Sequence, residues 1–196
     1  EALLAERLGV DTNRVLVTAG ADEAIERALE AVLVPGRELI VPSPTFEMIP
    51  IYGRLTGAEI RQIPWLEGAY PADAVLEAVS PATAAIAIVT PNNPTGAVAE
   101  LEDICRIAES VPNVLVLVDM AYGEFADSDY TDTLLGYPNV VMARTLSKAW
   151  GMPGLRVGYA VGDARVIAWM RGASGPYTVS RLSLAVAEAR MERGDA

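Results

Sequence analysis

The chain alternates strand-like and helix-like stretches nearly from end to end, and this alternation constrains the fold more than any other feature. Strand-like segments recur about every 20 to 30 residues, which leaves room for a helix that crosses between parallel strands. Two of them, residues 84–90 and 114–119, are almost continuous apolar runs, as in strands covered on both faces. The pattern predicts an α/β fold with three α-β-α layers around a mostly parallel sheet.

The individual elements can be located from residue periodicity and from the Pro and Gly residues that end several of them. The expected strands are residues 14–18, 38–41, 59–63, 84–90, 114–119, 139–144 and 156–161. The expected helices are residues 2–8, 20–33, 45–55, 71–79, 100–110, 163–170 and 180–193. No repeat, low-complexity tract or linker interrupts this series, so residues 1–196 are expected to form one domain.

Composition excludes several kinds of partner and site. The formal net charge is −11, whereas nucleic-acid binding requires clustered Lys and Arg, so we expect no nucleic-acid partner. No apolar run approaches the roughly 20 residues of a membrane-spanning helix, so we expect no membrane partner. Cys105 is the only cysteine, which excludes an internal disulfide and a thiolate zinc cluster. A cytoplasmic location fits these features, and we expect no metal site.

Two further absences narrow the chemistry. The sequence contains no histidine, which removes the Ser-His-Asp triad, the Cys-His pair and His-ligated metal sites. Lys148 is the only lysine among 15 basic residues. A genome rich in Arg codons would explain that scarcity but not the position of the one amine. Arg cannot form an imine, whereas a deprotonated lysine amine can attack an aldehyde.

Polar or Gly-rich segments directly follow four expected strands. They are residues 19–22, 90–96, 119–122 and 145–148. In parallel α/β sheets, ligands bind beyond the carboxyl ends of the strands. These four segments are therefore expected to converge on one edge of the sheet.

The segment Thr145-Leu146-Ser147-Lys148, with Arg156 after it, combines groups that could hold a phosphorylated aldehyde. The lysine can reach the aldehyde, while the two hydroxyls and the guanidinium can meet a phosphate. The alternative is a lysine on an ordinary turn.

Two other segments could hold the ring of such a ligand. Asp119 follows a buried strand and could pair with a protonated ring nitrogen, and Tyr122 and Asn93 could donate to a phenolic oxygen. Alternatively, Asp119 caps the following turn and the Asn-Pro sequence forms a simple turn.

The start of the second helix, Gly20-Ala21-Asp22-Glu23, could bind an anion through its free backbone N–H groups. We expect the amides to make that contact and the two acids to cap the helix. Phe46 could stack on an aromatic ring of the ligand, although a lone Phe more often belongs to the core.

Taken together, these motifs resemble the class I/II aminotransferases of pyridoxal-phosphate (PLP) fold type I, and they are most similar to the histidinol-phosphate aminotransferase branch. The resemblance covers essentially the whole chain. It implies an enzyme that binds pyridoxal 5′-phosphate and transfers an amino group between an amino acid and a 2-oxo acid. The donor would be histidinol phosphate or an aromatic amino acid.

The resemblance also assigns roles to individual residues. Lys148 corresponds to the Schiff-base lysine, Asp119 to the partner of the pyridine nitrogen, and Asn93 and Tyr122 to the ligands of the phenolic oxygen. Phe46 stacks on the ring, where the family often has Tyr. The residues implied for the phosphate cup are Ala21, Asp22, Thr145, Ser147 and Arg156.

At the level of architecture, the resemblance implies a large domain with a seven-stranded sheet in which the strand at 156–161 is antiparallel. The N-terminal arm and the C-terminal small domain of the family are expected to be absent from this chain, and a homodimer is expected. Met120 stands where the family usually has Glu, and it is expected to face away from the cofactor.

Three alternatives to an aminotransferase stay open at this point. A PLP-dependent decarboxylase or lyase would use the same cofactor site, and a non-catalytic PLP-binding effector domain would use it without turnover. A nucleotide-binding domain has little support, because neither G-x-G-x-x-G nor a P-loop GK[ST] occurs.

Overall fold

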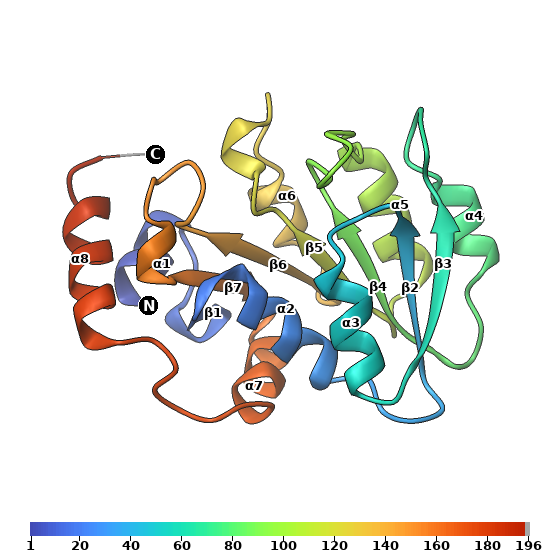
Figure 1. Ribbon diagram of the computed structural model, residues 1–196, viewed down its shortest axis with the longest axis horizontal. Helices are drawn as coiled ribbons and strands as arrows, with labels where there is room; N and C mark the ends of the chain where they lie inside the picture. Colours follow the sequence, from blue (N-terminus) through green and yellow to red (C-terminus); the bar gives the residue numbers. More distant parts are fainter. Residues whose placement is uncertain (195–196) are drawn as a thin grey trace.

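A computed structural model describes residues 1–194 and places seven strands in one sheet (Figure 1). The strands are β1 (Val15–Thr18), β2 (Glu38–Ser43), β3 (Glu59–Pro64), β4 (Thr83–Val89), β5 (Leu115–Asp119), β6 (Val140–Thr145) and β7 (Gly158–Gly162). Their order across the sheet is β1-β7-β6-β5-β4-β2-β3. The expected α/β fold with a mostly parallel seven-stranded sheet is confirmed.

One strand runs against the others. β7 lies between β1 and β6 and pairs antiparallel with both, whereas the pairs among β2 to β6 are parallel. The implied antiparallel strand is therefore confirmed, although it begins at Gly158 rather than Arg156. Arg156 has the left-handed backbone angle φ 51, which is incompatible with a strand. β7 thus starts at the sheet edge where its neighbours end.

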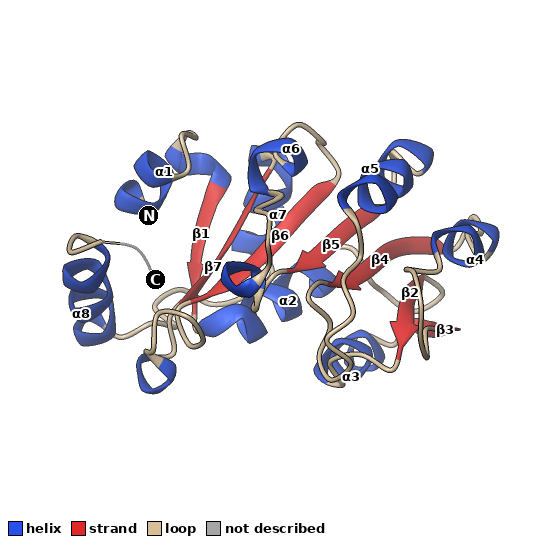
Figure 2. Ribbon diagram, turned by 90° about the horizontal axis from the view of Figure 1, so that it is seen from above, coloured by secondary structure: helices blue, strands red, loops and turns tan. Residues whose placement is uncertain are grey.

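Helices cover both faces of the sheet and form the outer layers (Figure 2). The α-helices are α1 (Ala2–Arg7), α2 (Gly20–Glu30), α3 (Met48–Leu55), α4 (Ala72–Glu77), α5 (Leu101–Ser110), α6 (Thr131–Leu134), α7 (Ala164–Gly172) and α8 (Arg181–Met191). Short 3₁₀ turns are η1 (Thr12–Arg14), η2 (Gly123–Phe125) and η3 (Pro153–Leu155). Helices α2, α3 and α7 pack on one face, and α1, α4, α5 and α6 pack on the other.

The sheet lies between two apolar cores, one for each helical layer. Every residue of β4, β5 and β6 is buried, and for β4 and β5 the continuous apolar runs predicted this. β3, at the edge, is mostly exposed. The central strands are therefore rigid supports for the loops that follow them. Within residues 1–194, no helix is long and apolar enough to cross a membrane.

Helices α3 and α6 also differ from the sequence-based expectation. α3 begins at Met48 rather than at residue 45, because Asn92 holds the preceding loop: its Nδ2 donates to Pro44 O, and its Oδ1 accepts from Thr45 Oγ1. The short helix α6 was not predicted, since four residues are too few to display a period.

Gly158 is expected to be intolerant of a side chain. A Cβ there would lie 2.4 Å from Gly20 C and 2.6 Å from Ala21 N, so β7 and the start of α2 would have to separate. Gly158→Ala should therefore lower the free energy of unfolding by about 2–3 kcal/mol, measured by denaturant titration.

The control is Gly172→Ala at the end of α7, where a Cβ would have no neighbour within 4 Å. This change should leave stability the same or slightly higher, because Ala is the better helix former. Equal stability of the two variants would contradict the close packing of α2 against β7.

Candidate functional site

A cavity of about 270 Å³ opens at the edge of the sheet where β4, β5 and β6 end. All ten residues that the sequence singled out line it: Ala21, Asp22, Phe46, Asn93, Asp119, Tyr122, Thr145, Ser147, Lys148 and Arg156. Three more lining residues were missed: Ile25, Val89 and Ala121. Ile25 lies one helical turn beyond the segment 19–22 and Val89 directly precedes the segment 90–96, so extending those two segments would have found them. Ala121 lies within the segment 119–122, but its apolar side chain gave no signal.

Lys148 reaches the cavity from the loop that follows β6. Its backbone O accepts a hydrogen bond from Gly151 N at 2.9 Å, which closes a tight turn around the lysine. The side chain is exposed overall, and its Nζ lies 5.0 Å from the centroid of the Tyr122 ring. The amine therefore faces the cavity wall formed by the loop after β5.

Asp119 is the last residue of β5 and is only 3% exposed. Its Oδ1 accepts a hydrogen bond from the Ala121 backbone N–H at 2.9 Å. Burial raises the pKa of Asp119 to about 7; the charge of Asp22 also raises it, while that of Lys148 lowers it. A carboxylate in this position is strongly stabilised by any cation that enters the cavity.

The hydroxyl groups of Thr145 and Ser147 and the guanidinium of Arg156 lie together in the cavity and are linked by hydrogen bonds. Thr145 Oγ1 donates to Ser147 Oγ at 3.0 Å, and Arg156 Nη1 donates to the same Ser147 oxygen at 3.2 Å. Arg156 has φ 51 and ψ 53, a left-handed conformation that is uncommon outside glycine. These groups form a donor-rich pocket that is suited to an anion.

The start of α2 completes this donor-rich part. Glu23 accepts a hydrogen bond from the Ala19 backbone N–H, so this acid caps the helix as expected. Asp22 does not: its Oδ2 accepts from Arg156 Nη2 at 2.9 Å instead. The expectation that both acids cap the helix was thus wrong for Asp22, because the antiparallel β7 returns Arg156 to this helix end.

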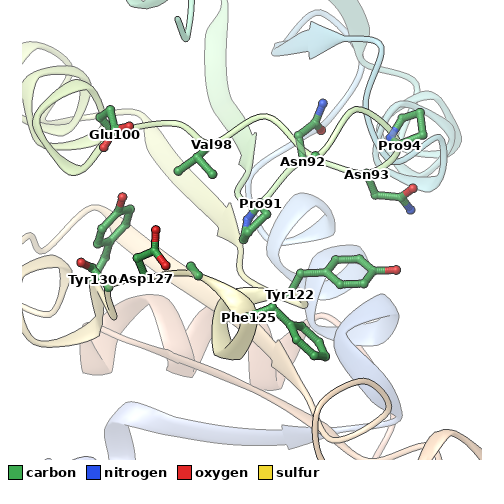
Figure 3. Close-up of a pocket in the computed structure, with 13 residues that line it drawn as sticks. Pro91, Asn92, Asn93, Pro94, Val98, Glu100, Tyr122, Phe125, Asp127 and Tyr130 are labelled. Carbon is green, nitrogen blue, oxygen red and sulfur yellow. The ribbon is translucent and has the colours of Figure 1, made fainter.

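The loop at residues 90–96 is held from within by Asn92, which is 3% exposed. Besides its bonds to the loop before α3, Asn92 Nδ2 donates to Thr95 Oγ1 at 2.9 Å. Figure 3 shows the neighbouring Asn93 and Tyr122 with their polar ends directed toward the same space. The sequence marked the loop but did not distinguish the supporting Asn92 from Asn93.

A second, wider cavity of about 620 Å³ adjoins the first (Figure 3). Asn93 and Tyr122 line both cavities, so they form the wall between them. The other side of the wider cavity carries Glu100, Asp127 and Tyr130. Among the residues that the structure describes, no cluster of three or more His, Cys, Asp or Glu could hold a metal ion.

Comparison with known proteins identifies the family. The sequence matches the pattern of aminotransferase class I and II over residues 1–195. The chain belongs to this family. It is 38% identical to histidinol-phosphate aminotransferase 1 of Bacillus cereus over 194 residues, which is 96% of this chain and 52% of that protein. It is 36% identical to an aromatic amino acid aminotransferase of Mycobacteroides abscessus, covering 96% of this chain and 55% of that protein.

The fold agrees with that of a solved family structure. Histidinol-phosphate aminotransferase from Sinorhizobium meliloti, solved with pyridoxal 5′-phosphate, superimposes with a TM-score of 0.90 over 97% of this chain and 53% of that one, at 23% identity. The expected class I/II aminotransferase family and its PLP fold type I architecture are confirmed. The chain spans about half the length of the curated relatives that it matches.

Burial of Asp119 is expected to make the cofactor-free chain less stable as pH rises. Its carboxyl binds a proton below about pH 7 when folded, but only below its ordinary value of 3.8 when unfolded. Between these values the folded state holds more protons, so stability falls with rising pH and stays low above pH 7. Asp119→Asn should therefore raise the free energy of unfolding by about 2 kcal/mol near pH 8, and by less near pH 5.

Thermal unfolding at the two pH values measures this difference. Asp163→Asn is the control, because the backbone N–H of Arg165 lowers the pKa of Asp163 and the native carboxylate is already stabilised. That substitution should not stabilise the chain near pH 8. A pH-independent difference between Asp119→Asn and the unmodified chain would show that Asp119 is not buried as described.

Proposed function

We propose that residues 1–196 are the cofactor-binding large domain of a PLP-dependent aminotransferase, with Lys148 bonded to the cofactor aldehyde as a Schiff base. The reaction transfers an amino group between an amino acid and a 2-oxo acid. The observation that carries this proposal is one cavity in which an amine, a buried carboxylate and a hydroxyl–guanidinium cluster face one another. Family membership supports the same class of reaction.

The donor-rich part of the cavity fits a phosphate. A side chain at position 20 would come within 2.6 Å of Arg156 Nη2, so glycine leaves room for the guanidinium over the start of α2. The guanidinium, the hydroxyls of Thr145 and Ser147 and the N–H groups around Ala21 would together bind the dianion. Asp22 already orients Arg156 and would share it with the phosphate.

The opposite part fits a pyridine ring. Asp119 would bind the protonated ring nitrogen, and that cation would bring its raised pKa down so that it is ionised at neutral pH. Phe46 would pack on the ring face, while Asn93 and Tyr122 would donate to its phenolic oxygen. When bound, the cofactor supplies an electron sink for charge that develops on the substrate α-carbon.

Lys148 would carry the proton. With the cofactor and an amino acid held in the cavity, a neutral Lys148 Nζ would accept the proton of the substrate α-carbon and would give a proton back when the product forms. Residues 1–196 contain no histidine, so no imidazole of this segment competes for the role. Tyr122, with its ring 5.0 Å from the Nζ, would keep the amine close to the reacting carbon.

The amino donor is proposed to be histidinol phosphate or an aromatic amino acid. Both are supported by the names of relatives that are 38% and 36% identical to this chain over the aligned residues. We also propose that the protein is a homodimer and that it is located in the cytoplasm, because it belongs to this family.

Addition of PLP to the chain should produce a visible absorbance band, and borohydride should fix the cofactor on the peptide that contains Lys148. Lys148→Arg keeps the positive charge but cannot form an imine, so the fixed adduct should disappear. Mass spectrometry of the digested protein locates the adduct.

Lys148 is the only lysine of the sequence, so no other side chain of residues 1–196 can form the imine. An adduct of equal yield in Lys148→Arg would refute the assignment of Lys148.

Product analysis tests the reaction itself. Incubation with histidinol phosphate or an aromatic amino acid should yield the matching carbonyl product and the aminated cofactor, without carbon dioxide or ammonia. Release of carbon dioxide would instead identify a decarboxylase, and release of ammonia a lyase. The assay uses stoichiometric cofactor, so that a single turnover is sufficient.

A further inference from the structure

A buried arginine lies behind the candidate site and lines neither cavity. Arg144 is on β6 next to Thr145, and it is 5% exposed. Successive strand residues point to opposite faces, so Arg144 points away from the cavity that Thr145 lines. A guanidinium loses several kcal/mol of hydration when it is buried, unless nearby groups compensate for that loss. The groups that compensate for this loss therefore indicate which role Arg144 has in the structure.

Within residues 1–194, the side chains that hydrogen-bond or form ion pairs with Arg144 come from the segment after Tyr122. Arg144 Nη2 lies 3.1 Å from Glu124 Oε1 in η2, Nη1 donates to Thr131 Oγ1 at 2.8 Å, and Nη1 lies 3.3 Å from Asp129 Oδ1. Asp129 also accepts from the Thr131 backbone N–H at 3.0 Å. One guanidinium thus fixes three points of a segment that is otherwise mostly loop.

A contribution to the stability of the fold does not by itself explain this network. Within residues 1–194, Arg144 Nε and Glu124 Oε2 are buried without a hydrogen-bond partner. Buried ion pairs that are not fully satisfied are commonly no more stabilising than apolar residues of the same size. Tyr159 of β7 also faces the guanidinium, and burial raises its pKa, so it stays neutral beside Arg144. The network is better explained by what it holds in place.

The segment that it holds carries Tyr122. Tyr122 immediately precedes η2, and its O accepts from the Phe125 backbone N–H at 3.0 Å. The rings of these two residues are 6.4 Å apart, and Figure 3 shows them side by side. A shift of Glu124 would therefore move Tyr122 relative to Lys148, which lies four residues after Arg144 on the continuation of β6.

We propose that Arg144 is a positioning residue that sets the direction of the Tyr122 hydroxyl toward the cofactor by clamping η2 and the start of α6 to β6. This inference rests on the proposed function, because Tyr122 acts on a bound cofactor. It adds to that function a residue that touches neither cofactor nor substrate.

The test is the pH midpoint of the visible absorbance change of the PLP-loaded chain. A hydroxyl that donates to the phenolic oxygen stabilises its anionic form, so loss of that donor raises the midpoint. Tyr122→Phe should raise it by about one unit or more, and Arg144→Met should raise it by at least half as much. Glu124→Gln, which keeps a weaker hydrogen bond, should give a smaller shift of the same sign.

A double variant separates positioning from a general loss of stability. If Arg144 acts through Tyr122, then Arg144→Met should add no shift in a Tyr122→Phe background. Arg171→Met is the matched control, because Arg171 bonds Glu1 and Val15 O far from the cavity. It should lower stability without moving the midpoint. Without cofactor, hydrogen exchange at residues 120–131 should accelerate in Arg144→Met but not in Arg171→Met.

The outcomes distinguish this inference from the proposed function. If the unmodified chain gives no visible band, the proposed function fails and this inference fails with it. If the band titrates normally but Arg144→Met leaves the midpoint unchanged, or adds its full shift to that of Tyr122→Phe, only the positioning role is refuted. Should Arg144→Met not fold, Arg144→Lys and Glu124→Gln replace it, and an unmoved midpoint in both refutes the role equally.

Discussion

The site depends on one constraint, which is the convergence of strand ends at a single edge of the sheet. β1, β4, β5 and β6 end at that edge because they run parallel, and β7 begins there because it runs against them. This reversal brings Arg156 to the start of α2, and Gly158 allows the two backbones to approach. The buried central strands fix the points from which the loops that line the cavity start.

The electrostatics of the cavity suit a ligand that is cationic at one end and anionic at the other. Asp119 lies at one end, and burial raises its pKa. A cation bound there would therefore offset the free energy that ionising this buried carboxyl requires. Arg156 and the start of α2 lie at the other end, partly satisfied by Asp22. A protonated pyridine that bears a phosphate has this distribution of charge. Arg144 supports the arrangement from behind the sheet, where it is shielded from solvent.

Much of the fold and of the cavity could be predicted because both follow from short patterns. Continuous apolar runs marked β4 and β5, and the polar residues after each strand marked the lining of the cavity. The contacts behind the site could not be predicted in this way. Arg144 looked like one more basic residue of a strand, and its partners occupy a loop and the four-residue α6, which show no period. Asn92 was likewise indistinguishable from Asn93 until the loop was seen to pack against the residues before α3.

The sequence by itself determined which chemical groups were available and on which strand ends they would lie. One lysine, no histidine and the order of the motifs restricted the chemistry before any geometry was known. Only the tertiary structure decided which groups meet. Asp22 and Arg156 are separated by 134 residues, and their pairing depends on β7 lying between β1 and β6. Periodicity reports which face of an element is buried, since burial acts on each residue locally. The order of strands is a property of the whole sheet, and no local pattern encodes it.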